Sequence, residues 1–91
     1  MDDEPVHVPI EDSLDLHTFG PRDVASVVEE YLREAHERGF REVRIVHGRG
    51  IGVQRSIVRA VLSRHQLVVS VADAPPARGG WGATIVRLRD S

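Results

Sequence analysis

The stretch EVRIVHGRGIGVQRSIVRAVL, residues 42 to 62, contains a β-rich run, three glycines and then apolar residues at helical spacing. It predicts a strand from 42 to 47, a tight turn, and a helix from about 53 to 65. The first N–H groups of a helix have no partner within it, so a glycine turn that leads into a helix can hold phosphate. The alternative is a turn that needs glycine only for its backbone conformation. The residues expected at a phosphate site are Gly48, Arg49, Gly50, Gly52 and Arg55.

The length of 91 residues allows one small domain with a modest core. We divide the chain into an extended acidic arm, residues 1 to 13, and a single domain, residues 14 to 91. Without cysteine, the chain has neither disulfides nor thiolate metal sites. The N-terminus lacks the features of a signal peptide, and no apolar run approaches the roughly 20 residues of a membrane helix. We therefore expect a cytoplasmic protein with no membrane partner.

The charges are divided unevenly along the chain. Residues 1 to 42 carry a net charge of −8, and residues 43 to 91 carry +6, with every basic residue an arginine. The overall charge of −2 argues against a protein that coats DNA without specificity. The second half still allows a local basic surface, and arginine suits bidentate contact with phosphate and stacking on bases.

The other apolar patterns predict three further strands and a second helix. We place strands at 14 to 17, 67 to 72 and 83 to 89, and a helix from Pro21 to about Gly39. The element order is then β-α-β-α-β-β. Right-handed crossovers put both helices on one face of the sheet, and the last strand inserts between the second and third, which gives the order 1-2-4-3. The expected fold class is α/β, as an α+β two-layer sandwich with a four-stranded mixed sheet.

Alternation along the strands assigns one set of side chains to the helix side of the sheet and another set to its open face. The expected helix-side set is Leu14, Leu16, Val43, Ile45, Val86 and Leu88. The expected open-face set is Asp15, His17, Arg44, Arg87 and Arg89. A carboxylate, a histidine and three arginines on an open face are better suited to a polar ligand than to core packing.

A second glycine cluster, Gly79-Gly80-Trp81-Gly82, precedes the last strand. A tryptophan between glycines is expected on a surface, where it could stack on a nucleic-acid base, a contact worth about 1–3 kcal/mol. The alternative is a lid over the edge of the core. We include Gly80, Trp81 and Gly82 with Arg44, Arg87 and Arg89 as candidate nucleic-acid contacts.

Three motifs together resemble the Small MutS-Related (Smr) domain: Leu14-Asp15-Leu16-His17, His47-Gly48-Arg49-Gly50, and Gly79-Gly80-Trp81-Gly82-Ala83-Thr84. Their order and spacing agree with the family over about residues 14 to 89. The resemblance implies a fold similar to the C-terminal domain of translation initiation factor three, and nucleic-acid binding, often with nicking or single-strand cleavage. Thr18 departs from the family pattern, which commonly has glycine there. We also expect no attached domain of the kind that directs fused family members to their targets.

The family positions linked to cleavage carry over as Asp15, His17 and His47, with Gly48 and Gly50 in the loop. Asp15 and His17 stand two apart on a predicted strand, about 6.6 Å along it. A carboxylate near an imidazole orients the ring and raises its pKa, which suits acid–base work on a phosphodiester. His47 is either a second acid or base, or a residue that shapes the loop.

Asp15, His17 and His47 could also bind Mg²⁺ or Mn²⁺. Acidic residues near the motifs are few, so we expect no obligatory metal. The chain is too short for a dinucleotide-binding domain, so a small-molecule cofactor is not expected.

Three interpretations of the function follow from these residues. The first interpretation is an endonuclease that acts on single strands, with RNA ahead of DNA. The second is a non-catalytic nucleic-acid binding module, and the third is a protein-interaction module that uses the acidic helix.

Overall fold

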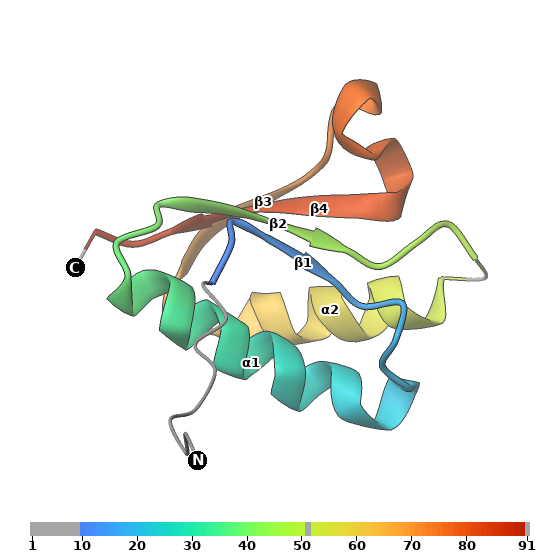
Figure 1. The fold of residues 1–91 in the computed structure, drawn as a ribbon, viewed down its shortest axis with the longest axis horizontal. Coiled ribbons are helices and arrows are strands. Elements are labelled where there is room, and N and C mark those ends of the chain that lie inside the picture. The colour runs from blue at the N-terminus through green and yellow to red at the C-terminus, as the bar shows by residue number, and fades with distance from the viewer. Residues whose placement is uncertain (1–9, 51, 91) are drawn as a thin grey trace, which may run out of the picture.

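A four-stranded sheet and two helices form two layers in the computed structural model, which describes residues 10 to 50 and 52 to 90 (Figure 1). Most of the expected N-terminal arm, residues 1 to 9, lies outside the described residues. The predicted element order is confirmed, with two short 3₁₀ turns added. The elements are β1 (Ser13–Asp15), α1 (Pro21–Glu37), β2 (Glu42–Val46), α2 (Val53–Arg64), β3 (Val68–Asp73), η1 (Pro76–Arg78), η2 (Gly80–Gly82) and β4 (Ala83–Leu88).

The sheet has the predicted order β1-β2-β4-β3. Strands β1 and β2 are parallel, and β4 runs antiparallel to both of its neighbours. Ile45 lies opposite Leu14 on one side and Thr84 on the other. Because residues that pair across a sheet share a face, this register sends Ile45 and its neighbours toward the helices.

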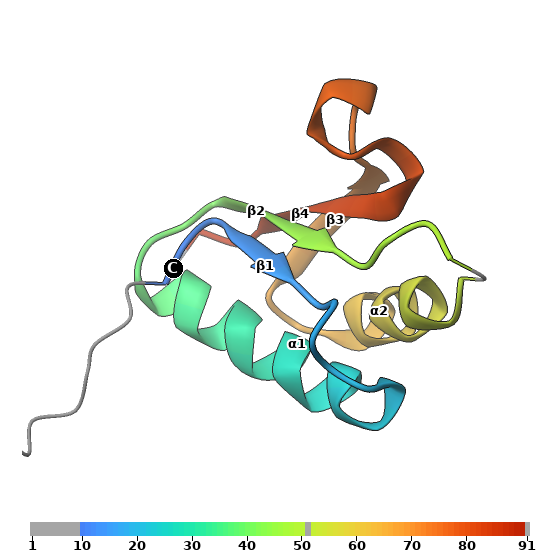
Figure 2. The same cartoon turned by 45° about the vertical axis from the view of Figure 1, so that its right-hand side comes forward.

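Both helices cover the same face of the sheet, as Figures 1 and 2 show. Helix α1 begins at Pro21 and ends before Gly39, which takes the left-handed φ of +89° that favours glycine at this position. The predicted helix-side residues of the sheet are buried, except Leu14, which is half-buried because β1 is an edge strand. The buried core consists of Leu16, Val24, Val28, Tyr31, Leu32, Ala35, Val43, Ile45, Val58, Val61, Leu62, Val86 and Leu88.

The other face of the sheet carries the segment between β3 and β4, which rises away from the helices (Figures 1 and 2). The Arg44 guanidinium donates to the Arg78 carbonyl oxygen at 3.0 Å and to the Ser13 hydroxyl at 3.3 Å. Arg78 in turn pairs with Glu42 at 3.3 Å. This face, which was predicted to be open, is therefore partly covered by η1, and Arg44 holds η1 in place. Neither helix of the described residues is long and apolar enough to cross a membrane.

Candidate nucleic-acid interface

The three motifs meet where β1 and β2 end and β4 begins, and we call this end of the sheet the motif edge. The parallel strands β1 and β2 end there, β4 begins there, and α2 starts just beyond the glycine loop of residues 47 to 52 (Figure 1). The pairing continues past β1, because the Leu16 N–H donates to the Val46 carbonyl at 2.9 Å. The chain order predicted from the sequence thus places the Asp15–His17 motif beside the glycine loop.

Asp15 and His17 form a close pair on the surface. The Asp15 carboxylate accepts a bond from the backbone N–H of His17 at 2.9 Å and lies 3.0 Å from Nδ1 of the same residue. The chain leaves the strand at Asp15, so the ring turns back to the carboxylate instead of standing about 6.6 Å along a strand, as was expected. The His17 backbone N–H, followed by its ring, holds the pKa of Asp15 below its usual range.

The His17 side chain is 76% exposed. With Nδ1 held by the carboxylate, Nε2 is the ring nitrogen that can exchange a proton with a ligand. An oriented imidazole whose free nitrogen reaches solvent is the arrangement that general acid–base catalysis requires.

His47 has a different environment, because it is buried and both of its ring nitrogens have partners. Nδ1 lies 3.1 Å from the Gly48 carbonyl oxygen, and Nε2 lies 2.9 Å from the Thr84 hydroxyl. Since a carbonyl oxygen can only accept, Nδ1 carries the proton and Nε2 accepts from Thr84. Burial lowers the pKa of His47, so the neutral ring is the form that this site favours.

We expect the free energy of unfolding to fall as the pH drops below the ordinary histidine pKa of about 6.5. There the unfolded chain binds a proton that folded His47, with its lowered pKa, does not bind. The contribution of neutral His47 to the free energy of unfolding is fully present above about pH 6.5. It decreases as the pH falls from about 6.5 to the lower pKa of His47 in the folded protein, by at most about 1.4 kcal/mol per pH unit. Urea unfolding at several pH values should show this decline, and His47→Gln should flatten it.

The control for this measurement is His65, because burial lowers the pKa of that residue as well. His65→Gln should remove only its own share of the pH dependence. If His47→Gln leaves the profile of the wild-type protein unchanged, the ring is not held neutral by the fold.

The glycine loop is fixed by contacts with the second glycine cluster. The Gly82 carbonyl oxygen accepts from the N–H groups of His47 and Gly48, at 3.0 and 2.9 Å. A Cβ on Gly82 would lie 3.0 Å from Arg49 Cγ and 3.4 Å from the Gly48 carbonyl carbon, so only glycine fits here without displacement. The two loops therefore form one structural unit.

Positive φ occurs at Gly48, +86°, and at Gly52, +88°, whereas Gly50 does not have it. The backbone conformation therefore requires glycine at the first and third of the loop's glycines, Gly48 and Gly52, whereas Gly50 faces open space. A hollow of about 190 Å³ lies at this turn, between the loop and the start of α2. Its lining includes His47, Gly48, Gly50, Gly52, Val53 and Gln54.

The first turn of α2 contains no acidic residue that would offset the helix dipole. Gly52 gives no side-chain cap, and the first turn contains no acidic residue, whereas α1 has Asp23 at the same place. The Gln54 side chain donates to the Phe19 carbonyl oxygen at 2.8 Å. The hollow therefore adjoins helix N–H groups and partial positive charge, which are suited to an anion.

Arg55, predicted to contact phosphate, is engaged within the chain. It donates to Asp73 at 2.8 Å, and its guanidinium lies 4.7 Å from the centre of the Trp81 ring. Arg59 bonds the same carboxylate, which the two arginines hold at a lowered pKa. The sequence assigned no role to Asp73 or Arg59, and none to Thr84 beyond its place in the third motif, although Arg55 and Arg59, one helical turn apart, are spaced to share a partner.

Trp81 is 43% exposed and contacts the first glycine loop. Its ring stands at 89° to that of His47, with 6.4 Å between the ring centres, and its edge is 3.6 Å from where a Gly52 Cβ would be. Arg49 runs along Gly80 and Gly82 of the same cluster. The surface position predicted for Trp81 is confirmed.

Arg87 and Arg89 lie at the far end of β4 from the glycine loops. Arg87 is exposed opposite Glu42, and Arg89 donates to the Gln66 carbonyl. The structure thus separates the predicted arginines: Arg49 and Arg55 lie at the loops, Arg44 lies on the sheet face beside η1, and the Arg87–Arg89 pair lies at the opposite end. In the ranges 10 to 50 and 52 to 90, no three His, Asp or Glu side chains gather as metal ligands.

Residues 14 to 89 match the model of the Smr domain family. Endonuclease MutS2 of Caldicellulosiruptor saccharolyticus is 42% identical over 78 residues, which are 86% of this chain and 10% of the relative. Endonuclease MutS2 of Thermus thermophilus is 40% identical over 76 residues, or 84% of this chain and 10% of that protein. The chain thus spans about a tenth of the length of these curated relatives.

Two solved structures share the fold. The crystal structure of the Smr domain of Thermus thermophilus MutS2 superimposes with a TM-score of 0.81 and 39% identity, covering 85% of this chain and 96% of that chain. The crystal structure of YdaL, a stand-alone small MutS-related protein from Escherichia coli, superimposes with a TM-score of 0.83 and 31% identity. The match covers 90% of this chain and 67% of YdaL.

Proposed function

This chain belongs to the Smr domain family, and we propose that it binds a single strand of RNA at the motif edge of the sheet and cuts it. The observation that carries the proposal is the Asp15–His17 pair, in which a carboxylate 3.0 Å from Nδ1 orients an exposed imidazole. The relatives named endonuclease MutS2 support cleavage as the activity. A single-strand substrate is favoured because Trp81 can stack only on a base that is free of its neighbours.

The phosphate next to the cut would lie in the hollow at the start of α2. The N–H groups of the first helical turn and the helix dipole supply attraction there, and no acidic side chain in that turn opposes it. Arg49, which follows Gly48 in the loop and runs along the second glycine cluster, would supply a full positive charge to the bound strand. These groups also suit the extra negative charge that phosphate acquires during the reaction.

On RNA, His17 Nε2 would take the proton of the ribose 2′-OH next to the bound phosphate. The 2′-oxygen then bonds to phosphorus, the bond from phosphorus to the 5′-oxygen breaks, and the leaving oxygen takes a proton from water. The products are a 2′,3′-cyclic phosphate and a 5′-hydroxyl. Asp15 supports the positive charge that the ring gains in this step.

His47 has a supporting role in this proposal. Its two ring nitrogens bond Gly48 and Thr84, so it ties the loop to β4 rather than exchanging protons with substrate. Proton transfer is thereby left to His17, and no metal ion is obligatory.

The test is a labelled single-stranded RNA incubated with the protein in EDTA. We expect a cut that leaves a 2′,3′-cyclic phosphate, identified by its resistance to phosphatase until acid opens the ring. A matched RNA with a single 2′-deoxy nucleotide at the mapped position should bind equally and stay intact there. DNA of the same sequence should bind without being cut.

Each other outcome points to a different function. Cleavage of the 2′-deoxy substrate would mean that water attacks the phosphate. Activity that is lost in EDTA and restored by Mn²⁺ would place Asp15 and His17 at a metal ion. Binding of RNA without a cut under all conditions would favour the second candidate, a non-catalytic binding module, which the same hollow and arginines support.

A further inference from the structure

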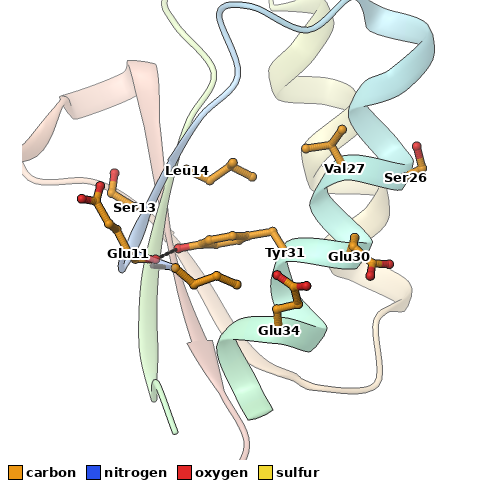
Figure 3. A pocket seen from close by; sticks show the side chains of 9 residues that line it. Glu11, Ser13, Leu14, Ser26, Val27, Glu30, Tyr31 and Glu34 are labelled. Atoms are coloured by element: carbon orange, nitrogen blue, oxygen red, sulfur yellow. Dashed lines mark hydrogen bonds between the residues drawn. The ribbon is translucent and has the colours of Figure 1, made fainter. Parts of the chain in front are cut away.

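A groove of about 730 Å³ lies between the edge strand β1 and helix α1, away from the glycine loops (Figure 3). Its floor is apolar and is formed by Ile10, Leu14 and Val27. Tyr31 crosses from α1 to the strand side, where its hydroxyl donates to the Glu11 carbonyl at 2.6 Å. Neither Asp15, His17 nor any loop glycine lines this groove, so the proposed cleavage site does not account for it.

The groove is bordered by backbone that can pair with another strand. Strand β1 pairs only with β2, through groups that include the Asp12 carbonyl and the Leu16 N–H. Because backbone groups alternate in direction along a strand, those of Ser13 and Asp15 point to the outer side. Within the described residues no strand pairs with that side. Such an edge accepts an added strand.

Carboxylates lie on both borders of the groove. The Glu11 carboxylate lies on the side of β1 away from α1, and Glu30 and Glu34 lie on α1, where Arg33 pairs with Glu30 at 2.5 Å. After burial, which is the larger cause, the charges of Asp12 and Glu11 raise the pKa of the Tyr31 hydroxyl. The potential at the groove is therefore negative, which repels nucleic acid and attracts a cationic ligand.

We propose that the outer edge of β1 and this groove bind an extended peptide segment of another protein, in which apolar residues alternate with arginine or lysine. The peptide adds a strand beside β1 and bonds the outward backbone groups of Ser13 and Asp15. Its apolar side chains enter the groove over Leu14 and Val27. Its basic side chains lie on the other face, where they meet the Glu11 carboxylate.

The probe is a fluorescein-labelled, acetylated hexapeptide with the sequence Arg-Val-Arg-Val-Arg-Val. We expect a Kd of about 10–100 μM by fluorescence polarisation. In amide NMR spectra, the shifts should change at residues 10 to 15 and 26 to 34 and stay constant in the glycine loops. Glu11→Arg should weaken binding about tenfold, whereas Glu37→Arg, an equal charge change outside the groove, should alter it less than about twofold.

Two N-methylated peptides separate strand pairing from simple charge attraction. One is methylated at every valine amide and the other at every arginine amide, so each blocks the hydrogen bonds along one edge of the peptide only. One of the two should lose binding while the other retains it, which also reports the direction of the added strand.

Four results would overturn the proposal. These are equal binding of both methylated peptides, equal weakening by Glu11→Arg and Glu37→Arg, no binding up to about 1 mM peptide, and dimerisation of the chain through this face without peptide. None of these measurements depends on whether the protein cuts RNA.

Discussion

Replacement of His17 by alanine is expected to slow RNA cleavage by about 10²–10⁴-fold, the range that a positioned acid or base contributes. Affinity for the RNA should change little, because the proposed phosphate contacts come from the α2 N-terminus and from Arg49 rather than from this ring. The fold should also be retained, since the His17 side chain is 76% exposed. Single-turnover rates and RNA affinity, measured for both proteins, give the two quantities separately.

Added imidazole provides the control, because a small base that enters the space left by the ring should restore part of the activity of His17→Ala. Asp15→Asn should slow cleavage less than His17→Ala, since asparagine keeps an oxygen that can accept from the His17 backbone and Nδ1. A His17→Ala protein that cuts as fast as wild type would contradict the assignment. Loss of affinity equal to the loss of rate would make His17 a binding residue instead.

The fold was predictable because its signals are local and periodic. Apolar residues at helical spacing gave α1 and α2, and alternation gave the faces of β2 and β4. The rule for right-handed crossovers then left few ways to connect the strands, and the observed order β1-β2-β4-β3 is the predicted one. The motif edge follows from that order, because parallel strands end on the same side.

The state of individual side chains at the site was less predictable. Arg55 looks like a phosphate ligand in the sequence, but Asp73, 18 residues away, and Trp81 engage it. His47 resembles a second catalytic histidine until Thr84, 37 residues away, is placed at its Nε2. These roles depend on contacts between residues far apart in the sequence, and no periodic sequence pattern predicts such contacts.

The backbone of the glycine loop shows the same limit, because three glycines in alternation do not tell which of them needs a positive φ. The turn uses Gly48 and Gly52 for this purpose, and Gly82 is required for another reason, the close approach of two loops. The difference between these glycines and Gly50 gives the second large prediction.

Gly82→Val is expected to destabilise the protein by about 2–4 kcal/mol, the combined effect of overpacking and of two weakened hydrogen bonds. The valine methyl groups would push against Arg49 and the Gly48 backbone, which lie 3.0 and 3.4 Å from the position of a Cβ. The bonds from the His47 and Gly48 N–H groups to the Gly82 carbonyl would lengthen as the loops separate. Urea unfolding measures the loss, and RNA affinity should fall with it, because the hollow at α2 depends on the position of this loop.

Gly50→Val is the matched control, with the same substitution in the same pair of loops. Gly50 has no positive φ, and nothing lies within 4 Å of the position of its Cβ, so its stability should stay within about 0.5 kcal/mol of wild type, as for ordinary surface changes. If both variants were equally destabilised, the loop would require glycine throughout for its conformation. If Gly82→Val were as stable as wild type, the contact between the two glycine clusters would be too loose to hold a phosphate site in shape.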